Sequence, residues 1–225
     1  TGQHIKNKPH RHEPAEDFIC QQVEVFEGDN DIEFALAVLA RAEFVGKLPH
    51  AERPPGREND IEEDFDATMD IVRTMGAECV IDGDDIVVHS KNPHELTPLS
   101  LNMNDCSDLV PVVAVLCACA KGASELTGVG FIRNKESDRL GDVALELTKC
   151  GINVEVLPDG LRIVGGTPTG AVIDTHHDHR VAMAFSVLSV VADGMVIQNA
   201  DVVSKSWPKF YADMSSILGP MAQEN

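Results

Sequence analysis

The hydrophobic and polar positions along the chain predict an alternation of short strands and longer helices. Short apolar runs bounded by Gly, Pro or Asp predict strands, and apolar residues spaced three or four apart predict helices. The predicted strands cover residues 18–26, 78–81, 85–89, 99–103, 124–130, 153–157, 161–164, 171–174 and 195–197. The predicted helices cover residues 31–42, about 60–75, 109–120, 136–150, 181–192 and 210–218.

The predicted elements form a repeat. The order strand, helix, strand, helix, strand, strand recurs with a period of roughly 70 residues, which indicates similar structural units. Three units are expected, at about 22–97, 98–168 and 169–220 of a domain that covers 22–225. Residues 1–21 are expected to be a flexible segment or an interdomain remnant. The third unit lacks a closing pair of strands, so those strands come from another segment or stay absent.

This repeat predicts an α/β (α+β) fold built from βαβαββ units with pseudo-threefold packing. The run 181–192 is apolar on all sides and contains no charged residue, as expected of a buried helix. The helices are therefore expected inside and the sheets outside.

Composition narrows the classes of partner. The chain has 225 residues, a formal net charge of −19, and 37 acidic against 18 basic residues. Such an acidic surplus argues against nucleic acid and against anionic membranes as partners. No apolar run is long enough for a membrane span, and no signal peptide is visible. Six cysteines without a C-x-x-C pair favour reduced thiols and a cytoplasmic protein. The chain begins with Thr, as expected of a fragment or a processed product.

The stretch 131–140, FIRNKESDRL, is unusually cationic for this chain. It carries Arg133, Lys135 and Arg139 at a predicted helix start, where the helix dipole prefers anions. One interpretation is a solvated helix end with local ion pairs. The other is a group of cations that receives an anionic ligand.

Polar residues also precede the other predicted helices. If these helices point the same way, their N-termini share one face, and free N–H groups there suit phosphate or carboxylate ligands. The side chains on that face combine carboxylates for proton transfer, a histidine, and cations for a polyanionic substrate. They are Asp108, Lys135, Glu136, Arg139, Asp178, His179, Arg180 and Lys205.

Each of these features has a simpler explanation. Asp108 and Asp178 are both placed to serve only as helix caps. The run 176–179, HHDH, lacks a matching Cys/His cluster, which argues against a metal site. Trp207 is expected to pack rather than to stack on a ligand, and no Gly-rich phosphate loop is present.

Several motifs, in order, resemble those of the EPSP synthase (3-phosphoshikimate 1-carboxyvinyltransferase) family. The stretch 134–140, NKESDRL, resembles its lysine–glutamate–aspartate–arginine signature, and 178–183, DHRVAM, its second signature. The resemblance extends over about residues 23–218. It also includes 27–29 (EGD), 104–108 (NDCSD) and 204–208 (SKSWP).

The resemblance implies a protein of two similar domains with the active site between them, of which this chain is the C-terminal one. It implies that the missing strands of the third unit come from the extreme N-terminus of the full-length protein. The implied partners are phosphoenolpyruvate, shikimate 3-phosphate and the N-terminal domain of the same enzyme. Neither the residues nor the resemblance requires a cofactor or a metal ion.

The implied reaction transfers the enolpyruvyl group of phosphoenolpyruvate to the 5-hydroxyl of shikimate 3-phosphate and releases phosphate. The resemblance implies catalytic roles for Asp108, Glu136 and Lys205. It implies that phosphoenolpyruvate is bound by Arg139, His179, Arg180 and Lys205. It implies that shikimate 3-phosphate is contacted by Asp108 and Lys135.

The chain also departs from the family pattern. Phe131 stands where some members use Asn against the shikimate phosphate, and the Pro-rich loop 45–59 is longer than expected. The residues of the other domain are absent, so the isolated chain is expected to be inactive. Two alternatives stay open: an enolpyruvyl transferase that uses UDP-N-acetylglucosamine, and a non-catalytic anion-binding module.

Overall fold

The computed structural model describes residues 18–19, 67–82, 85–90 and 96–218. The predicted helix 31–42 and the loop 45–59 lie outside these residues. Of the predicted helix at 60–75, the described part covers 67–74, and Gly76 ends it with a φ of 106°, as the sequence predicts. Strands β2 (Ala77–Asp82) and β3 (Asp85–Ser90) then form the predicted antiparallel hairpin.

The second unit folds around a four-stranded sheet. Its elements are β4 (Ser100–Asn102), α3 (Val110–Cys119), β5 (Ala123–Thr127), α4 (Gly141–Lys149), β6 (Asn153–Leu157) and β7 (Gly160–Val164). The strand order is β4-β5-β7-β6, with β4 parallel to β5 and the other pairs antiparallel. The unit therefore has the predicted order of elements.

The third unit repeats the first part of this arrangement. Strand β8 (Val172–Asp174) is parallel to β9 (Val196–Gln198), and the helices are α5 (His179–Leu188) and α6 (Phe210–Leu218). Strand β1 (Phe18–Ile19) pairs antiparallel with the other edge of β9. Because β7 pairs with β5 in the same way, β1 takes the place of a closing strand. The predicted strand 18–26 thus contributes its first two residues to the third unit.

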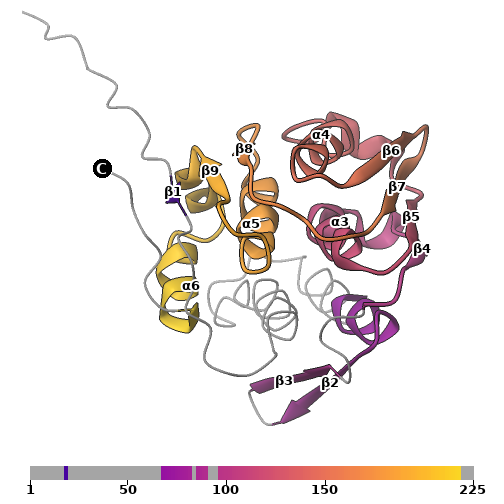
Figure 1. Cartoon of the computed structure of the whole chain (residues 1–225), viewed down its shortest axis with the longest axis horizontal. Helices are drawn as coiled ribbons and strands as arrows, with labels where there is room; N and C mark the ends of the chain where they lie inside the picture. Colours follow the sequence, from indigo (N-terminus) through magenta and orange to yellow (C-terminus); the bar gives the residue numbers. More distant parts are fainter. Residues whose placement is uncertain (1–17, 20–66, 83–84, 91–95, 219–225) are drawn as a thin grey trace, which may run out of the picture.

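Helices α3 and α5 lie side by side in the interior (Figure 1). Eight of the ten residues of α3 and seven of the ten residues of α5 are buried. The strands β4–β7 lie at the edge of the molecule in the same view, and buried and exposed side chains alternate along β5 and along β7 from Leu161. The prediction of helices inside and sheets outside is confirmed for α3 and α5 and for the sheet β4–β7, whereas α4 has an exposed face that includes Leu145.

Two further features bear on the sequence predictions. Trp207 is partly buried, packs edge-to-face on Phe210 with ring centroids 5.2 Å apart, and donates its Nε1 hydrogen to Asp213. It is therefore a packing residue, as predicted. Among the described residues, no helix is both long enough and apolar enough to cross a membrane.

The start of α4 differs from the prediction. The sequence predicts a helix from Glu136, but residues 130–134 form the 3-10 turn η2 (Gly130–Asn134), and α4 begins at Gly141. The carboxylate of Asp138 accepts the Gly141 amide hydrogen at 3.0 Å and so fixes this later start. The segment 135–140 is thereby left outside any helix, where its side chains are free to reach other elements.

Candidate active site

Three segments that precede the α-helices α3, α4 and α5 bring most of the predicted site residues together. The 3-10 turn η1 (Asn104–Leu109) precedes α3 and carries Asp108. The segment 135–140 precedes α4, and the turn 175–178 precedes α5. Because these segments meet at the same end of the packed helices, residues about 30 to 70 positions apart in the chain make direct contacts.

Arg139 is at the centre of this cluster. Its side chain is 1% exposed, and its guanidinium faces three carboxylates. Nε donates to Asp178 Oδ2 at 2.7 Å, Nη1 to Asp108 Oδ1 at 2.8 Å, and Nη2 to Glu136 Oε2 at 2.6 Å. The planar fork of an arginine can satisfy several carboxylates at once, which makes its burial tolerable.

Burial and these contacts oppose each other at Arg139. Burial lowers the pKa of the guanidinium, but the hydrogen bonds and negative charge of Asp178, with the charges of Asp108 and Glu136, raise the net pKa above its ordinary value. Arg139 is therefore a permanent cation around which the carboxylates are arranged.

The carboxylate of Asp108 forms ion pairs with three cationic side chains. Besides Arg139, Arg180 Nη2 lies 3.2 Å from Asp108 Oδ2, and Lys135 Nζ lies 3.6 Å from Asp108 Oδ1. Burial raises the pKa of the Asp108 carboxyl, but Arg180, Arg139 and Lys135 outweigh it and hold the pKa below its usual value. The interpretation of Asp108 as a helix cap alone is wrong. No side chain caps the start of α3, and the Asp108 carboxylate points to the cations.

Asp178 has two tasks. It caps α5, as the sequence predicts, because its Oδ1 accepts the Arg180 amide hydrogen at 2.9 Å. Its Oδ2 also accepts the Arg139 Nε hydrogen and the Ser137 hydroxyl. Burial raises the pKa of this fully buried carboxyl, but the hydrogen bonds and charge of Arg139 keep the net pKa below its ordinary value.

His179 follows Asp178 at the first position of α5. Its Nδ1 is buried and has no hydrogen-bond partner among the described atoms; the nearest carboxylate oxygen, Asp178 Oδ1, is 3.9 Å away. Burial, together with the positive charge of Arg180, lowers the pKa of the imidazole. His179 is thus a neutral ring with one unused polar atom.

Lys205 lies apart from this cluster. It ends the 3-10 turn η3 (Ala200–Lys205), and its Nζ donates to the His177 carbonyl oxygen at 2.8 Å. Its link to the site therefore runs through the backbone of the turn 175–178 and not through a carboxylate. Of the eight predicted residues, six meet in one network of hydrogen bonds and ion pairs, His179 lies beside it without a hydrogen bond from its Nδ1, and Lys205 joins only at its edge.

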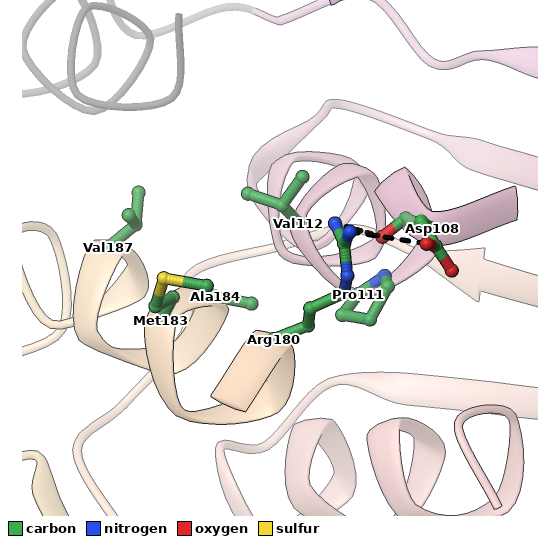
Figure 2. Close-up of a pocket in the computed structure, with 7 residues that line it drawn as sticks. All are labelled: Asp108, Pro111, Val112, Arg180, Met183, Ala184 and Val187. Carbon is green, nitrogen blue, oxygen red and sulfur yellow. Dashed lines mark hydrogen bonds and ion pairs between the residues drawn. The ribbon is translucent and has the colours of Figure 1, made fainter. Parts of the chain in front are cut away.

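A small hollow of about 30 Å³ opens beside the cluster, between α3 and α5 (Figure 2). Arg180 reaches from α5 to Asp108 at one end of it. The other lining residues are apolar: Pro111, Val112, Met183, Ala184 and Val187. One end of the hollow is thus lined by charged side chains and the rest by apolar ones.

The structure separates the two interpretations of the cationic stretch. Arg133 pairs with Asp138 at 3.2 Å, both partly exposed, as expected of a local ion pair. Arg139 is buried among carboxylates from other segments and is not part of a solvated helix end. The conflict with the helix dipole does not arise, because α4 begins later and has Asp142 in its first turn.

Some residues of the network were not predicted. Ser137 donates to Asp178, and Glu146 and His176 form a second polar cluster behind the turn 175–178. One signal for Glu146 was available, because it lies on the same helical face as the buried Val143 and Leu147. An acid at such a position indicates a buried polar contact.

The chain has the fold seen in solved enolpyruvyl transferases. It superposes on the enolpyruvyl transferase NikO from Streptomyces tendae with a TM-score of 0.58 at 22% identity, over 87% of this chain and 44% of that one. It also superposes on an EPSP synthase from Acinetobacter baumannii with a TM-score of 0.58 at 29% identity, over 70% and 39% of the two chains.

The family itself follows from the sequence match. Residues 57–214 match the model of EPSP synthase (3-phosphoshikimate 1-carboxyvinyltransferase), and the chain belongs to this family. It is 41% identical over 149 residues to the 3-phosphoshikimate 1-carboxyvinyltransferase of Methanosphaera stadtmanae, and 41% identical over 151 residues to that of Pyrococcus abyssi. These matches cover 66% and 67% of this chain but 34% and 36% of the relatives. The matched part thus spans about a third of their length.

Proposed function

We propose that this chain is the C-terminal half of an enzyme that transfers the enolpyruvyl group of phosphoenolpyruvate to the 5-hydroxyl of shikimate 3-phosphate and releases phosphate. The observation that carries the proposal is the contact network of Arg139 with Asp108, Glu136 and Asp178. It joins residues from both family signatures in one partly open cluster beside a hollow.

The reaction needs proton transfers that fit the carboxylates. The acceptor oxygen bonds to C2 of phosphoenolpyruvate while its proton leaves, and C3 gains a proton to give a tetrahedral intermediate. The C2–O bond to phosphate then breaks as a proton leaves C3. Asp108 is proposed to take or orient the hydroxyl proton, and Glu136 and Lys205 to exchange protons with C3 and the leaving group.

The cations fit the charge of the substrates. Arg139, His179, Arg180 and Lys205 are proposed to bind phosphoenolpyruvate, and Lys135 to contact shikimate 3-phosphate with Asp108. Guanidinium groups suit carboxylate and phosphate because they donate two parallel hydrogen bonds. Burial lowers the pKa of the His179 imidazole, so its ring is proposed to contact phosphoenolpyruvate without adding charge.

The ligand-free arrangement adds one step to this proposal. Asp108 is a weak base while three cations hold its pKa down. An anionic substrate competes with Asp108 for Arg180 and Lys135, whose side chains are more exposed than that of Arg139. As these cations turn to the substrate, the carboxylate becomes more basic at the moment when it has a proton to accept.

The other half of the site is proposed to come from an N-terminal domain, and this chain to be inactive alone. The matches cover only about a third of the length of the curated relatives, which supports a missing domain. The domain is proposed to cover 22–225, with units at about 22–97, 98–168 and 169–220, and to include β1 as an added strand of the third unit. The reduced thiols of Cys117, Cys119 and Cys150 support a reducing, cytoplasmic setting.

The test is phosphate release from phosphoenolpyruvate and shikimate 3-phosphate, with the chain alone and with added N-terminal domain. Turnover is expected only in the mixture, and no turnover with UDP-N-acetylglucosamine as the acceptor. Activity of the chain alone, or turnover with the second acceptor only, would contradict the proposal.

The role of the carboxylates is tested in the active mixture. Replacing Asp108 with Asn or Glu136 with Gln is expected to lower kcat by about 10²–10⁴-fold, the usual contribution of acid–base groups. Asp105→Asn is the matched control, since Asp105 is exposed on the same turn and bonds to Asn104. Equal effects of Asp105→Asn and Asp108→Asn would count against a catalytic Asp108. An anion-binding module would show binding of phosphoenolpyruvate with no turnover to lose.

A further inference from the structure

A second polar cluster lies behind the turn 175–178, and Glu146 is its centre. Glu146 is fully buried on the inner face of α4. Its carboxylate accepts the Lys149 Nζ hydrogens at 2.7 and 2.9 Å, the Asp174 amide hydrogen at 3.2 Å, and faces His176 Nε2 at 2.8 Å. A buried carboxylate with this many hydrogen-bond partners holds those partners in fixed positions.

His176 connects Glu146 to the turn 175–178. Its ring lies between two carboxylates of α4, with Nε2 at Glu146 and Nδ1 3.5 Å from Asp142 Oδ1. Its backbone amide donates to Asp174 Oδ1 at 2.8 Å. The charged groups around the ring are therefore Asp142, Glu146 and Lys149 on α4 and Asp174 on β8.

The turn 175–178 has a backbone conformation that is unfavourable for residues other than Gly and Asn. The Asp178 amide donates to the Thr175 carbonyl at 2.9 Å, and the two central residues, His176 and His177, have φ values of 50° and 57°. This is the pattern of a type I′ turn, which normally takes Gly or Asn at its centre. A backbone held in a disfavoured region persists when surrounding contacts determine it, and the His176–Glu146 contact does so here.

We propose that His176, held by Glu146, is a positioning residue that sets the turn 175–178 for the transfer. The inference rests on the proposed function for its effect on catalysis, but its structural part stands alone. Asp178 follows His176 by two residues, holds Arg139 and caps the helix that carries Arg180. The His177 carbonyl holds Lys205. Displacement of His176 is therefore expected to weaken both the Asp178–Arg139 contact and the His177–Lys205 contact.

The first test needs only the chain as it is. The Arg139 Nε hydrogen is buried against Asp178, so its nitrogen-15 NMR signal and its exchange with solvent report on the turn. His176→Phe keeps a flat ring without a donor, and His176→Gln keeps an N–H that can reach Glu146. His177→Phe is the matched control, since His177 is exposed and shares the same backbone region.

In His176→Phe, the exchange of the Arg139 Nε hydrogen is expected to accelerate about tenfold or more, the factor for losing a hydrogen bond to a charged group. His176→Gln is expected to restore most of the protection, and His177→Phe to leave it unchanged. Amides in α3 are expected to keep their exchange rates. Uniform acceleration over the whole core, or equal effects at 176 and 177, would overturn the proposal.

A second variant keeps the test valid when His176→Phe does not fold. Glu146→Gln removes the buried charge and leaves the partly exposed Lys149 free to reach water. It is expected to accelerate exchange at Arg139 severalfold, with α3 unaffected. Unchanged exchange at Arg139 would overturn the proposal as well.

The last measurement concerns the reconstituted enzyme. His176→Phe is expected to raise the KM for phosphoenolpyruvate about tenfold and to change kcat less, because Asp178 places the proposed binding cations. An unchanged KM would overturn the positioning role while the transfer activity stands. Absence of turnover in the unmodified mixture would instead refute the proposed function, and the NMR result would still decide whether His176 sets the turn.

Discussion

Replacing Asp178 with Asn removes one charge from the centre of the site and little else. Asn has the same shape as Asp and is equally good as a helix cap, so the contact with the Arg180 amide survives. The pair with Arg139 does not survive in its charged form, although both side chains stay buried.

The structure sets the size of the effect. Removing one partner of a buried ion pair typically costs about 3–5 kcal/mol, because the other charge is left without compensation. Arg139 keeps Asp108 and Glu136 as partners, so we expect the lower end, about 3 kcal/mol of the free energy of unfolding. Asp178→Ala is expected to cost about 1 kcal/mol more, because the cap is lost too.

Urea unfolding followed by circular dichroism measures both values. Asp193→Asn makes the same chemical change at an exposed position and serves as the control. A midpoint for Asp178→Asn that matches the control within error would refute the reasoning, since it would mean that Arg139 does not depend on Asp178.

The same variant has a predicted pH dependence. Because the pKa of Asp178 is depressed in the folded state, its stabilisation is present above the unfolded pKa of about 3.9 and is lost as pH falls through the lower folded pKa. The stability gap between the wild type and Asp178→Asn is therefore expected to be largest at neutral pH and to close in acid. A gap that widens on acidification would show that the sign is wrong.

Three further results are expected. Burial raises the pKa of Cys117 to about 11 and of Cys119 to about 12. Iodoacetamide at pH 8 should therefore label neither thiol until the chain unfolds. Mass spectrometry of the labelled peptides tests this, and labelling of the folded chain would contradict it. In Gly160→Ala the new Cβ meets the Leu126 carbonyl oxygen, so we expect a loss of about 2 kcal/mol or more in thermal unfolding, and a neutral result would mean that the hairpin can shift. The depressed pKa of His179 means that its stabilisation is full above the unfolded pKa of about 6.5 and is lost as pH falls through the lower folded pKa. His179→Gln should flatten the fall in melting temperature below that pH, and identical profiles would contradict this.

The order of elements was predictable because each of its signals is local. The hairpin of β6 and β7 follows from two alternating runs around a Pro-Asp-Gly turn, and Gly76 and Gly151 end helices with positive φ as expected. The start of α4 was not predictable in the same way. Residues 136–140 suit a helix by propensity, but the contacts of Arg139 with other segments hold them in another conformation.

The gathering of most candidate residues was predictable, but the contacts within the cluster were not. The motifs indicate which residues gather, since parallel helices bring their starts together. They do not indicate that Arg139 is buried or that Lys205 turns to a carbonyl, because both depend on contacts across 28 to 39 residues. His176 was considered only as part of a metal pattern, since its partner Glu146 lies 30 residues away.

The cluster around Arg139 has one more consequence, which concerns the approach of a ligand from a distance. Its ionised side chains balance, with three anions and three cations: Asp108, Glu136 and Asp178 against Lys135, Arg139 and Arg180. A balanced site in a chain of net charge −19 offers no long-range field to draw in a phosphorylated molecule. Under the proposed function, we expect this chain alone to capture such a substrate slowly and faster with added salt, and the proposed N-terminal domain to supply the field that steers it.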